Sequence, residues 1–300
     1  GFQPDWVWIK KRNGAVGHRL YDAVRGVQNT LFSQDTAVEA TGQSTTLTAF
    51  NSDGFTVISE SGVNASGDTY VAWNWLGANT TVSNTAGSIT STVSANTTAG
   101  FSIVSYTGNS VSATVGHGLG VEPKFIIIKH RNDADDWTCY HTSLGASQRI
   151  QLNNTGASSA LSWGGSPTSS VFYLLGGGAT AVNVTGGTYI AYCFAAIKGY
   201  SSFGSYTGNG NVDGPFVYTG FKPAFVLFKN TTTAGTNWQI NDSARDTFNV
   251  MNKRLAPSSS DAEATDYNFG DFLSNGFKIR QTDQTWNKSG DTYIYMCFCI

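Results

Sequence analysis

The stretch GFQPDWVWIK at residues 1–10 returns as GVEPKFIIIK at 120–129 and as GFKPAFVLFK at 220–229. Each copy has a glycine, a proline three residues later, an apolar run and then a lysine. The apolar runs are short and rich in β-branched and aromatic residues, which predicts a buried β-strand in each copy. Repetition in one order at this length indicates a chain built from homologous units.

A second repeated phrase lies later in each unit. SGDTY occupies residues 66–70 and 289–293, and TGGTY occupies 185–189. The glycines at 67, 186 and 290 can supply φ > 0 in a tight turn, and the long apolar run that follows predicts a central strand buried on both faces. We interpret the phrase as a turn that leads into a core strand. We expect its tyrosine to cap the core with the hydroxyl toward solvent.

The spacing of the two phrases predicts three units. Pro4 to Tyr70 and Pro123 to Tyr189 both span 66 residues, and Pro223 to Tyr293 spans 70. Short strands separated by turn residues, in units near 100 residues, predict an all-β chain of three tandem antiparallel β-sandwich units of jelly-roll-like type. Unit 1 covers residues 1–76, unit 2 covers 101–199 and unit 3 covers 203–300.

The first unit is predicted to lack its N-terminal strand. SYTGN, which ends the opening strand of the other units, occurs at 105–109 and 205–209 only. We expect this chain to be the C-terminal part of something longer; the alternative is that a neighbouring subunit donates the strand. Residues 77–100 are rich in Ser, Thr, Asn and Gly, as in a linker, but SITSTVS at 88–94 alternates as an exposed edge strand would.

Composition limits the class of protein. Charged residues make up 13% and the formal net charge is -2, so neither nucleic acid nor an anionic lipid surface is an expected partner. No apolar run is long enough for a transmembrane helix, and no membrane insertion is expected. The four cysteines follow no zinc or redox spacing and are predicted to be buried free thiols.

A family resemblance accompanies these patterns. GSITSTVSANTTAGFSIVSYTGNSVSATVGHGLGVEPKFIIIKHRN (87–132) resembles sequences widespread in marine phage genomes, and residues 1–26 and 51–75 look like the same family. The resemblance implies an uncharacterised repeat domain of tail fibres or other virion structural proteins. It implies a location on the virion surface, other virion proteins as partners and a homotrimer. It brings no catalytic residue.

Few residues are candidates for chemistry. An indole offers an apolar face on which a sugar ring can stack. The candidates for glycan binding are four tryptophans: Trp137, Trp163, Trp238 and Trp286. For each of them the alternative is packing in the core or at an interface. The cluster RNDADDW is a weak candidate for calcium, with loop solvation as the alternative; its carboxylates are Asp133, Asp135 and Asp136. No catalytic group, other metal site or cofactor is nominated.

One further pair of charges recurs. Asp22 and Arg25 in unit 1 match Asp242 and Arg245 in unit 3, which predicts a local ion pair, whereas unit 2 carries His141 and leucine at 144. This difference argues against a shared functional site at these positions.

The expected function is that of a non-enzymatic bacteriophage virion structural protein, a tail fibre or similar appendage, with host-surface polysaccharide as a candidate ligand. One alternative is a capsid decoration protein, in which three tandem units imitate local threefold symmetry. The other is a glycan-degrading tailspike enzyme or its carbohydrate-binding modules, which would need two carboxylates about 5–9.5 Å apart.

Overall fold

The computed structural model describes residues 1–177 and 181–299. Within these ranges the chain forms β-strands and no helix, and the strands pair antiparallel in six sheets, so the all-β, sandwich-rich prediction is confirmed. The same residues therefore contain no helix that could cross a membrane.

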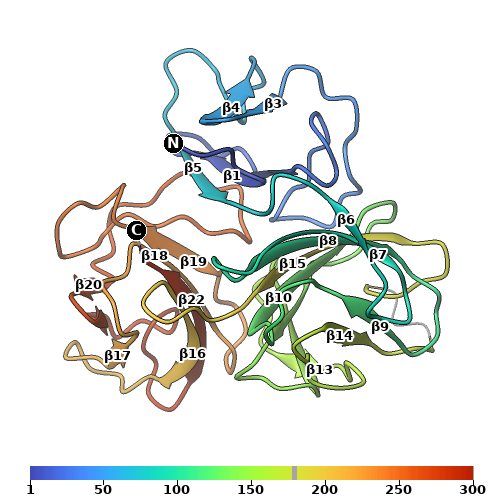
Figure 1. Ribbon diagram of the computed structural model, residues 1–300. Coiled ribbons are helices and arrows are strands. Elements are labelled where there is room, and N and C mark those ends of the chain that lie inside the picture. The colour runs from blue at the N-terminus through green and yellow to red at the C-terminus, as the bar shows by residue number, and fades with distance from the viewer. Residues whose placement is uncertain (178–180, 300) are drawn as a thin grey trace.

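Unit 1 is the smallest of three lobes and appears in blue at the top of Figure 1. Its inner sheet has the order β2-β1-β5, and its outer sheet is the hairpin β3-β4. The strands are β1 (Trp6–Lys11), β2 (Arg19–Asp22), β3 (Leu47–Asn51), β4 (Gly54–Val57) and β5 (Tyr70–Trp75).

Unit 2 carries the largest sheet, with the order β13-β12-β11-β10-β15-β8-β7-β6, and an outer pair β14-β9. Strands β6 and β7 come from residues 77–100 and extend the sheet beyond β8. The strands are β6 (Val82–Asn84), β7 (Ser91–Asn96), β8 (Phe101–Thr107), β9 (Ala113–Gly116), β10 (Phe125–His130), β11 (Thr138–His141), β12 (Gln148–Gln151), β13 (Ser159–Ala160), β14 (Val171–Leu174) and β15 (Thr188–Phe194).

Unit 3 has an inner sheet β16-β22-β18-β19 and an outer sheet β17-β21-β20. Its strands are β16 (Ser201–Thr207), β17 (Phe216–Tyr218), β18 (Phe225–Asn230), β19 (Gln239–Asp242), β20 (Gly270–Leu273), β21 (Gly276–Ile279) and β22 (Thr292–Phe298).

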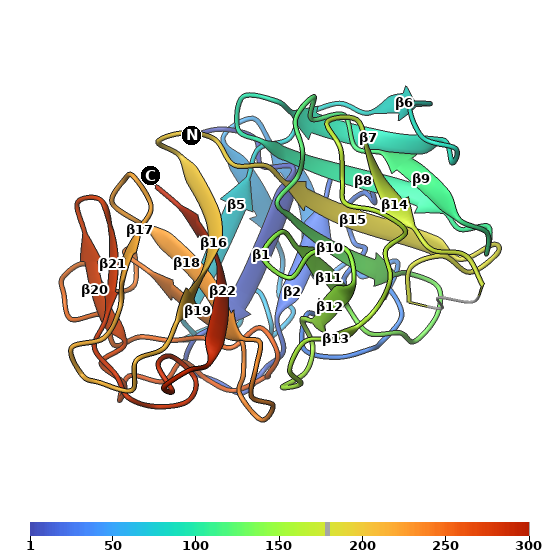
Figure 2. The ribbon, with the colours of Figure 1, turned by 90° about the horizontal axis from the view of Figure 1, so that it is seen from below.

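The three inner sheets pack against one another around a shared aromatic core. Figure 2 shows β1, β10 and β22 gathered near the centre of the molecule. Trp6 of unit 1 stacks on Tyr192 of unit 2 at 4.3 Å between ring centroids, and Trp75 contacts Phe225 and Phe298 of unit 3 at 5.7 and 6.0 Å. Side chains of all three units thus form one hydrophobic cluster.

Strand alternation explains why the repeated apolar runs are continuous. Phe125 and Ile127 of β10 belong to the shared core, whereas Ile126 and Ile128 belong to the core between the two sheets of unit 2. Because successive side chains of a strand point to opposite faces, a strand with a core on each side must be apolar at every position.

The SGDTY and TGGTY phrases form the predicted turns. Gly67, Gly186 and Gly290 have φ of 81°, 76° and 82°. The expected solvent-facing tyrosine hydroxyl is wrong: the hydroxyl of Tyr70 accepts from the N–H of Ala65, and those of Tyr189 and Tyr293 make the same bond five residues upstream, at 2.8–2.9 Å. A buried phenol needs a partner, and the turn supplies one.

Candidate functional site

The four tryptophans proposed to stack on sugars are all inside the protein. Trp137 and Trp286 are 0% exposed, Trp238 is 1% and Trp163 is 3%. A sugar can stack only on an accessible ring face, so none of these indoles can act as predicted. The sequence could not separate the two roles, because a loop-like stretch of polar residues surrounds each indole in either case.

Two of these indoles hold the units together. The Nε1–H of Trp137 donates to the carbonyl of Phe32 in unit 1, and that of Trp238 donates to the carbonyl of Gln151 in unit 2, both at 2.8 Å. At the third interface His18 replaces the tryptophan, and its Nε2 lies 3.0 Å from the carbonyl of Ala256 in unit 3. The same ring-to-carbonyl contact therefore closes a cycle through all three units.

Buried ion pairs form at two of the three interfaces. Arg25, whose side chain is fully buried, pairs with Asp22 and with Glu39, and Glu39 also reaches Arg131 of unit 2 at 2.7 Å. Although burial opposes the charge, the nearby carboxylates raise the pKa of Arg25. Burial likewise opposes the charge of Glu39, but the two arginines lower its pKa. These contacts are structural, because each charge is neutralised within the protein.

The interface between units 3 and 1 repeats this bridge. Glu263 accepts from Arg245 of its own unit at 2.9 Å and from Arg12 of unit 1 at 2.8 Å. Between units 2 and 3 the bridge is neutral, with the N–H of Ser158 donating to the carbonyl of Thr231 at 3.0 Å. Where position 144 carries no arginine, a backbone hydrogen bond thus stands in place of the ion pair.

The aspartates proposed for calcium do not converge on a vacant position. Asp135 lies 2.8 Å from His130 Nδ1, and Asp136 accepts from the amides of Gln151 and Asn153. The backbone carbonyls of this loop instead face an ammonium group, since Lys129 Nζ lies 2.9 Å from the carbonyl of Asp135. Across residues 1–177 and 181–299 no group of three or more His, Cys, Asp or Glu side chains could hold a metal ion.

The repeated lysines are also structural. Lys10, Lys129 and Lys229 are 0% exposed, and burial lowers the pKa of each to about 8. Lys129 donates to the carbonyl of Thr36 in unit 1 at 3.1 Å, and Lys229 lies 3.5 Å from the carbonyl of Thr155 in unit 2. Lys129 and Lys229 therefore each contact a loop of the neighbouring unit, whereas Lys10 donates to the carbonyls of Lys11 and Gly14 in its own unit.

The cysteines are free, as predicted. Three are buried and the fourth is partly buried: Cys139, Cys193, Cys297 and Cys299. Burial raises the pKa of the first three, which keeps these thiols protonated and unreactive.

Replacing His141 by asparagine is expected to weaken the acid sensitivity of the protein. His141 is 1% exposed, and burial lowers its pKa to about 4, against 6.5 for a free histidine. The unfolded chain therefore binds a proton that the folded chain does not, so stability falls as pH drops from 6.5 toward 4, by up to about 3 kcal/mol.

The measurement is urea unfolding at pH 7.0, 5.5 and 4.5 for both proteins. His141→Asn should lose less stability between the first and last pH than the unmodified chain. A residual slope is expected in the variant, because burial also lowers the pKa of His18. Equal slopes in the two proteins would show that His141 is not protonated on unfolding in this range.

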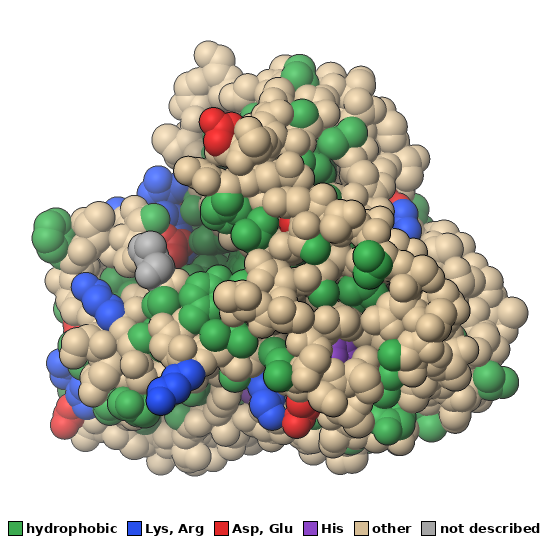
Figure 3. Space-filling model, viewed as in Figure 1, with side chains coloured by type: hydrophobic (Ala, Val, Ile, Leu, Met, Phe, Trp, Pro, Cys, Tyr) green, Lys and Arg blue, Asp and Glu red, His purple; other side chains and the backbone are tan. Residues whose placement is uncertain are grey.

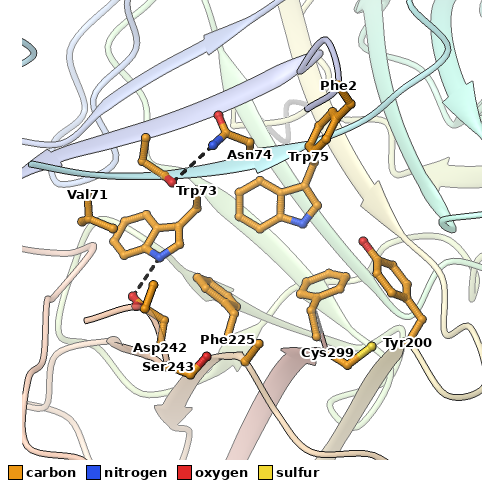
Figure 4. A pocket seen from close by; sticks show the side chains of 14 residues that line it. Phe2, Val71, Trp73, Asn74, Trp75, Tyr200, Phe225, Asp242, Ser243 and Cys299 are labelled. Carbon is orange, nitrogen blue, oxygen red and sulfur yellow. Dashed lines mark hydrogen bonds between the residues drawn. The ribbon is translucent and has the colours of Figure 1, made fainter. Parts of the chain in front are cut away.

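An open groove borders this shared core between units 1 and 3. It has a volume of about 300 Å³ and runs along the outer edge of β5. Its walls are Trp73 and Trp75 on one side and Phe225 and Asp242 on the other, with Phe2 at the rim (Figure 4). Figure 3 shows the hollow between the upper lobe and the lower left lobe, bordered by hydrophobic side chains.

The carboxylate of Asp242 in the groove is already engaged. The indole N–H of Trp73 donates to Asp242 Oδ2 at 3.0 Å, and the same carboxylate oxygen accepts from Arg245 at 2.6 Å. Most of the other lining side chains are aromatic or aliphatic, so the groove suits an apolar segment better than a polar substrate. No candidate residue from the sequence lies in this groove, and its one signal was that the SYTGN phrase occurs at 105–109 and 205–209 only.

Comparisons with known proteins give a family and no function. No curated protein and no solved structure matches the chain. One family model, described as a domain of unknown function (DUF7483), matches residues 1–299. Since the match covers nearly the whole chain, this protein belongs to the DUF7483 family.

Proposed function

We propose that this protein is a non-enzymatic structural component of a bacteriophage virion, in a tail fibre or similar surface appendage. The structural role is supported by what the buried charged, histidine and tryptophan side chains contact. Buried side chains bind the three units to one another, through His18, Lys129, Trp137 and Trp238 and through the carboxylates of Glu39 and Glu263. This pattern supports a rigid building block over a catalyst.

The virion assignment rests on the resemblance to marine phage sequences in the order of the repeated phrases. Glycan binding through the four candidate indoles is not part of the proposal, because all four are buried. A capsid decoration protein is the second candidate. The cyclic contacts at His18, Trp137 and Trp238 support it, since one chain with approximate threefold symmetry can sit on a local threefold axis.

The test is to locate the protein in intact particles by electron microscopy with gold-labelled antibodies. Labelling of tail appendages is expected, and labelling of the head would favour the decoration role. Protein secreted by a cell and absent from every particle would overturn the virion assignment.

The non-enzymatic part of the proposal has its own test. The purified protein is incubated with host polysaccharide, and viscosity and reducing ends are followed over time. No change is expected. A fall in viscosity with new reducing ends would identify a glycan-degrading enzyme instead.

A further inference from the structure

Two strands of unit 1 lack a neighbour that their counterparts have in the other units. Among the described residues, β5 pairs only with β1, and β4 pairs only with β3. In units 2 and 3 the counterparts of both strands pair with a strand that precedes the repeated proline. β15 pairs with β8 and β22 pairs with β16 over seven residues, while β14 pairs with β9 and β21 pairs with β17.

The outer edge of β5 presents backbone groups that no other strand pairs among the described residues. The N–H of Arg12 donates to the carbonyl of Thr69 at 2.7 Å, next to the ladder between β1 and β5. Hydrogen-bonded pairs alternate in an antiparallel ladder, so Tyr70, Ala72 and Asn74 turn their N–H and C=O groups away from β1. The side-chain amide of Asn74 donates to the carbonyl of Ala72 at 3.3 Å, where the N–H of a neighbouring strand would otherwise donate.

The side chains at this edge are also incompletely covered. Tyr189 of unit 2 stacks on Tyr106 of β8 at 5.0 Å, and Tyr293 of unit 3 stacks on Tyr206 of β16 at 4.8 Å. The matching Tyr70 is only half-buried. Three outer-sheet residues of unit 1 are half-buried as well: Phe50, Phe55 and Val57.

The groove lies where an opening strand would place its inward side chains. In unit 2, Phe101 and Ile103 of β8 fill the shared core beside β15. In unit 3, Phe203 of β16 packs against this core beside β22. Beside β5 the corresponding space is the groove lined by Trp73 and Trp75.

We propose that the edges of β5 and β4 bind an extended polypeptide segment whose sequence follows the opening strands of this repeat. Its pattern is that of FSIVSYTGN at 101–109 and SSFGSYTGN at 201–209. The segment adds to β5 as an antiparallel strand. Main-chain hydrogen bonds supply affinity, and alternate side chains set the register.

The register follows from the other units. Tyr106 pairs with Tyr189, Val104 with Ala191 and Ser102 with Cys193. The tyrosine of the bound segment therefore lies opposite Tyr70, and its serine lies opposite Asn74. Asn74 occupies the place of a buried cysteine in the other units, and its amide can bond the serine hydroxyl. The inward side chains fill the groove.

The test uses a synthetic peptide of residues 99–110, AGFSIVSYTGNS. We expect saturable binding to the 300-residue chain by calorimetry. A peptide with Tyr106→Ala should bind roughly tenfold more weakly or worse, since it loses the aromatic pair. Failure of the first peptide to bind at about 1 mM would overturn the proposal.

The matched protein variant is Ala72→Pro. Proline removes one N–H from the outer edge and leaves the ladder to β1 intact, as edge strands tolerate. The variant should keep its circular dichroism spectrum and lose peptide binding. Unchanged binding would place the peptide elsewhere and overturn the proposal. Dimerisation of the unmodified chain that Ala72→Pro abolishes would identify a second copy as the occupant, and would also overturn it.

A chimera gives an independent readout. Gly120 corresponds to Gly1, so residues 101–119 fused directly ahead of Gly1 keep the spacing of unit 2. The fusion should raise the melting temperature and block the free peptide. A fusion that binds the peptide as well as the parent chain does would contradict the assignment. These outcomes do not depend on whether the protein belongs to a virion.

Discussion

Replacing Trp6 by alanine is expected to lower the free energy of unfolding by about 3–5 kcal/mol and to destabilise all three units together. Trp6 is 0% exposed and its ring lies 4.5 Å from that of Trp75, 4.3 Å from Tyr192 and 5.8 Å from Phe101. The last two belong to unit 2. A cavity at this position therefore removes packing from more than one unit.

Urea unfolding followed by tryptophan fluorescence and by circular dichroism measures the effect. A single transition should shift to lower urea in both signals. Phe248→Ala is the control, because Phe248 is 84% exposed and its loss should change stability by less than about 0.5 kcal/mol. Two separate transitions, with only one shifted by Trp6→Ala, would show that the units fold independently.

Replacing Arg25 by leucine, the residue that unit 2 carries at this place, is expected to cost about 3–5 kcal/mol of stability. The change leaves the buried carboxylate of Asp22 without its cation and removes the contact between Arg25 and Glu39, 2.7 Å long. It also removes the donor to the carbonyl of Leu20 at 2.9 Å. Leaving one buried charge without its partner lowers stability far more than replacing both charges of the pair by uncharged residues.

The matched control transplants the whole arrangement of unit 2. Asp22→His with Arg25→Leu removes both charges, so it should be more stable than Arg25→Leu alone by about 1 kcal/mol or more. Chemical denaturation of the two single variants and the double variant gives this coupling energy. Additive effects would mean that the ion pair contributes nothing specific at this interface.

Local features were predictable because local sequence controls them. The repeated prolines and apolar runs mark β1, β10 and β18. The turn glycines at 67, 186 and 290 have the predicted positive φ, since residues with a β-carbon seldom adopt it. The pairs at 22 and 25 and at 242 and 245 are ion pairs, as predicted, but their role at the interfaces required the structure.

The candidate site was less predictable, because exposure is a property of the assembled units. Trp137 and Trp238 lie in polar loop segments, and each donates to a carbonyl of a different unit. The groove beside β5 exists because one strand edge faces another unit with nothing between them. Neither fact can be derived from the residues near those positions.

The sequence by itself determined that the chain is all-β, and its repeated phrases predicted three copies of one unit. Only the tertiary structure decided that the three inner sheets share one core and that Trp137 and Trp238 join the units. The physical reason is one of range. Strand alternation and turn geometry depend on neighbouring residues, whereas burial depends on which distant surface covers each face.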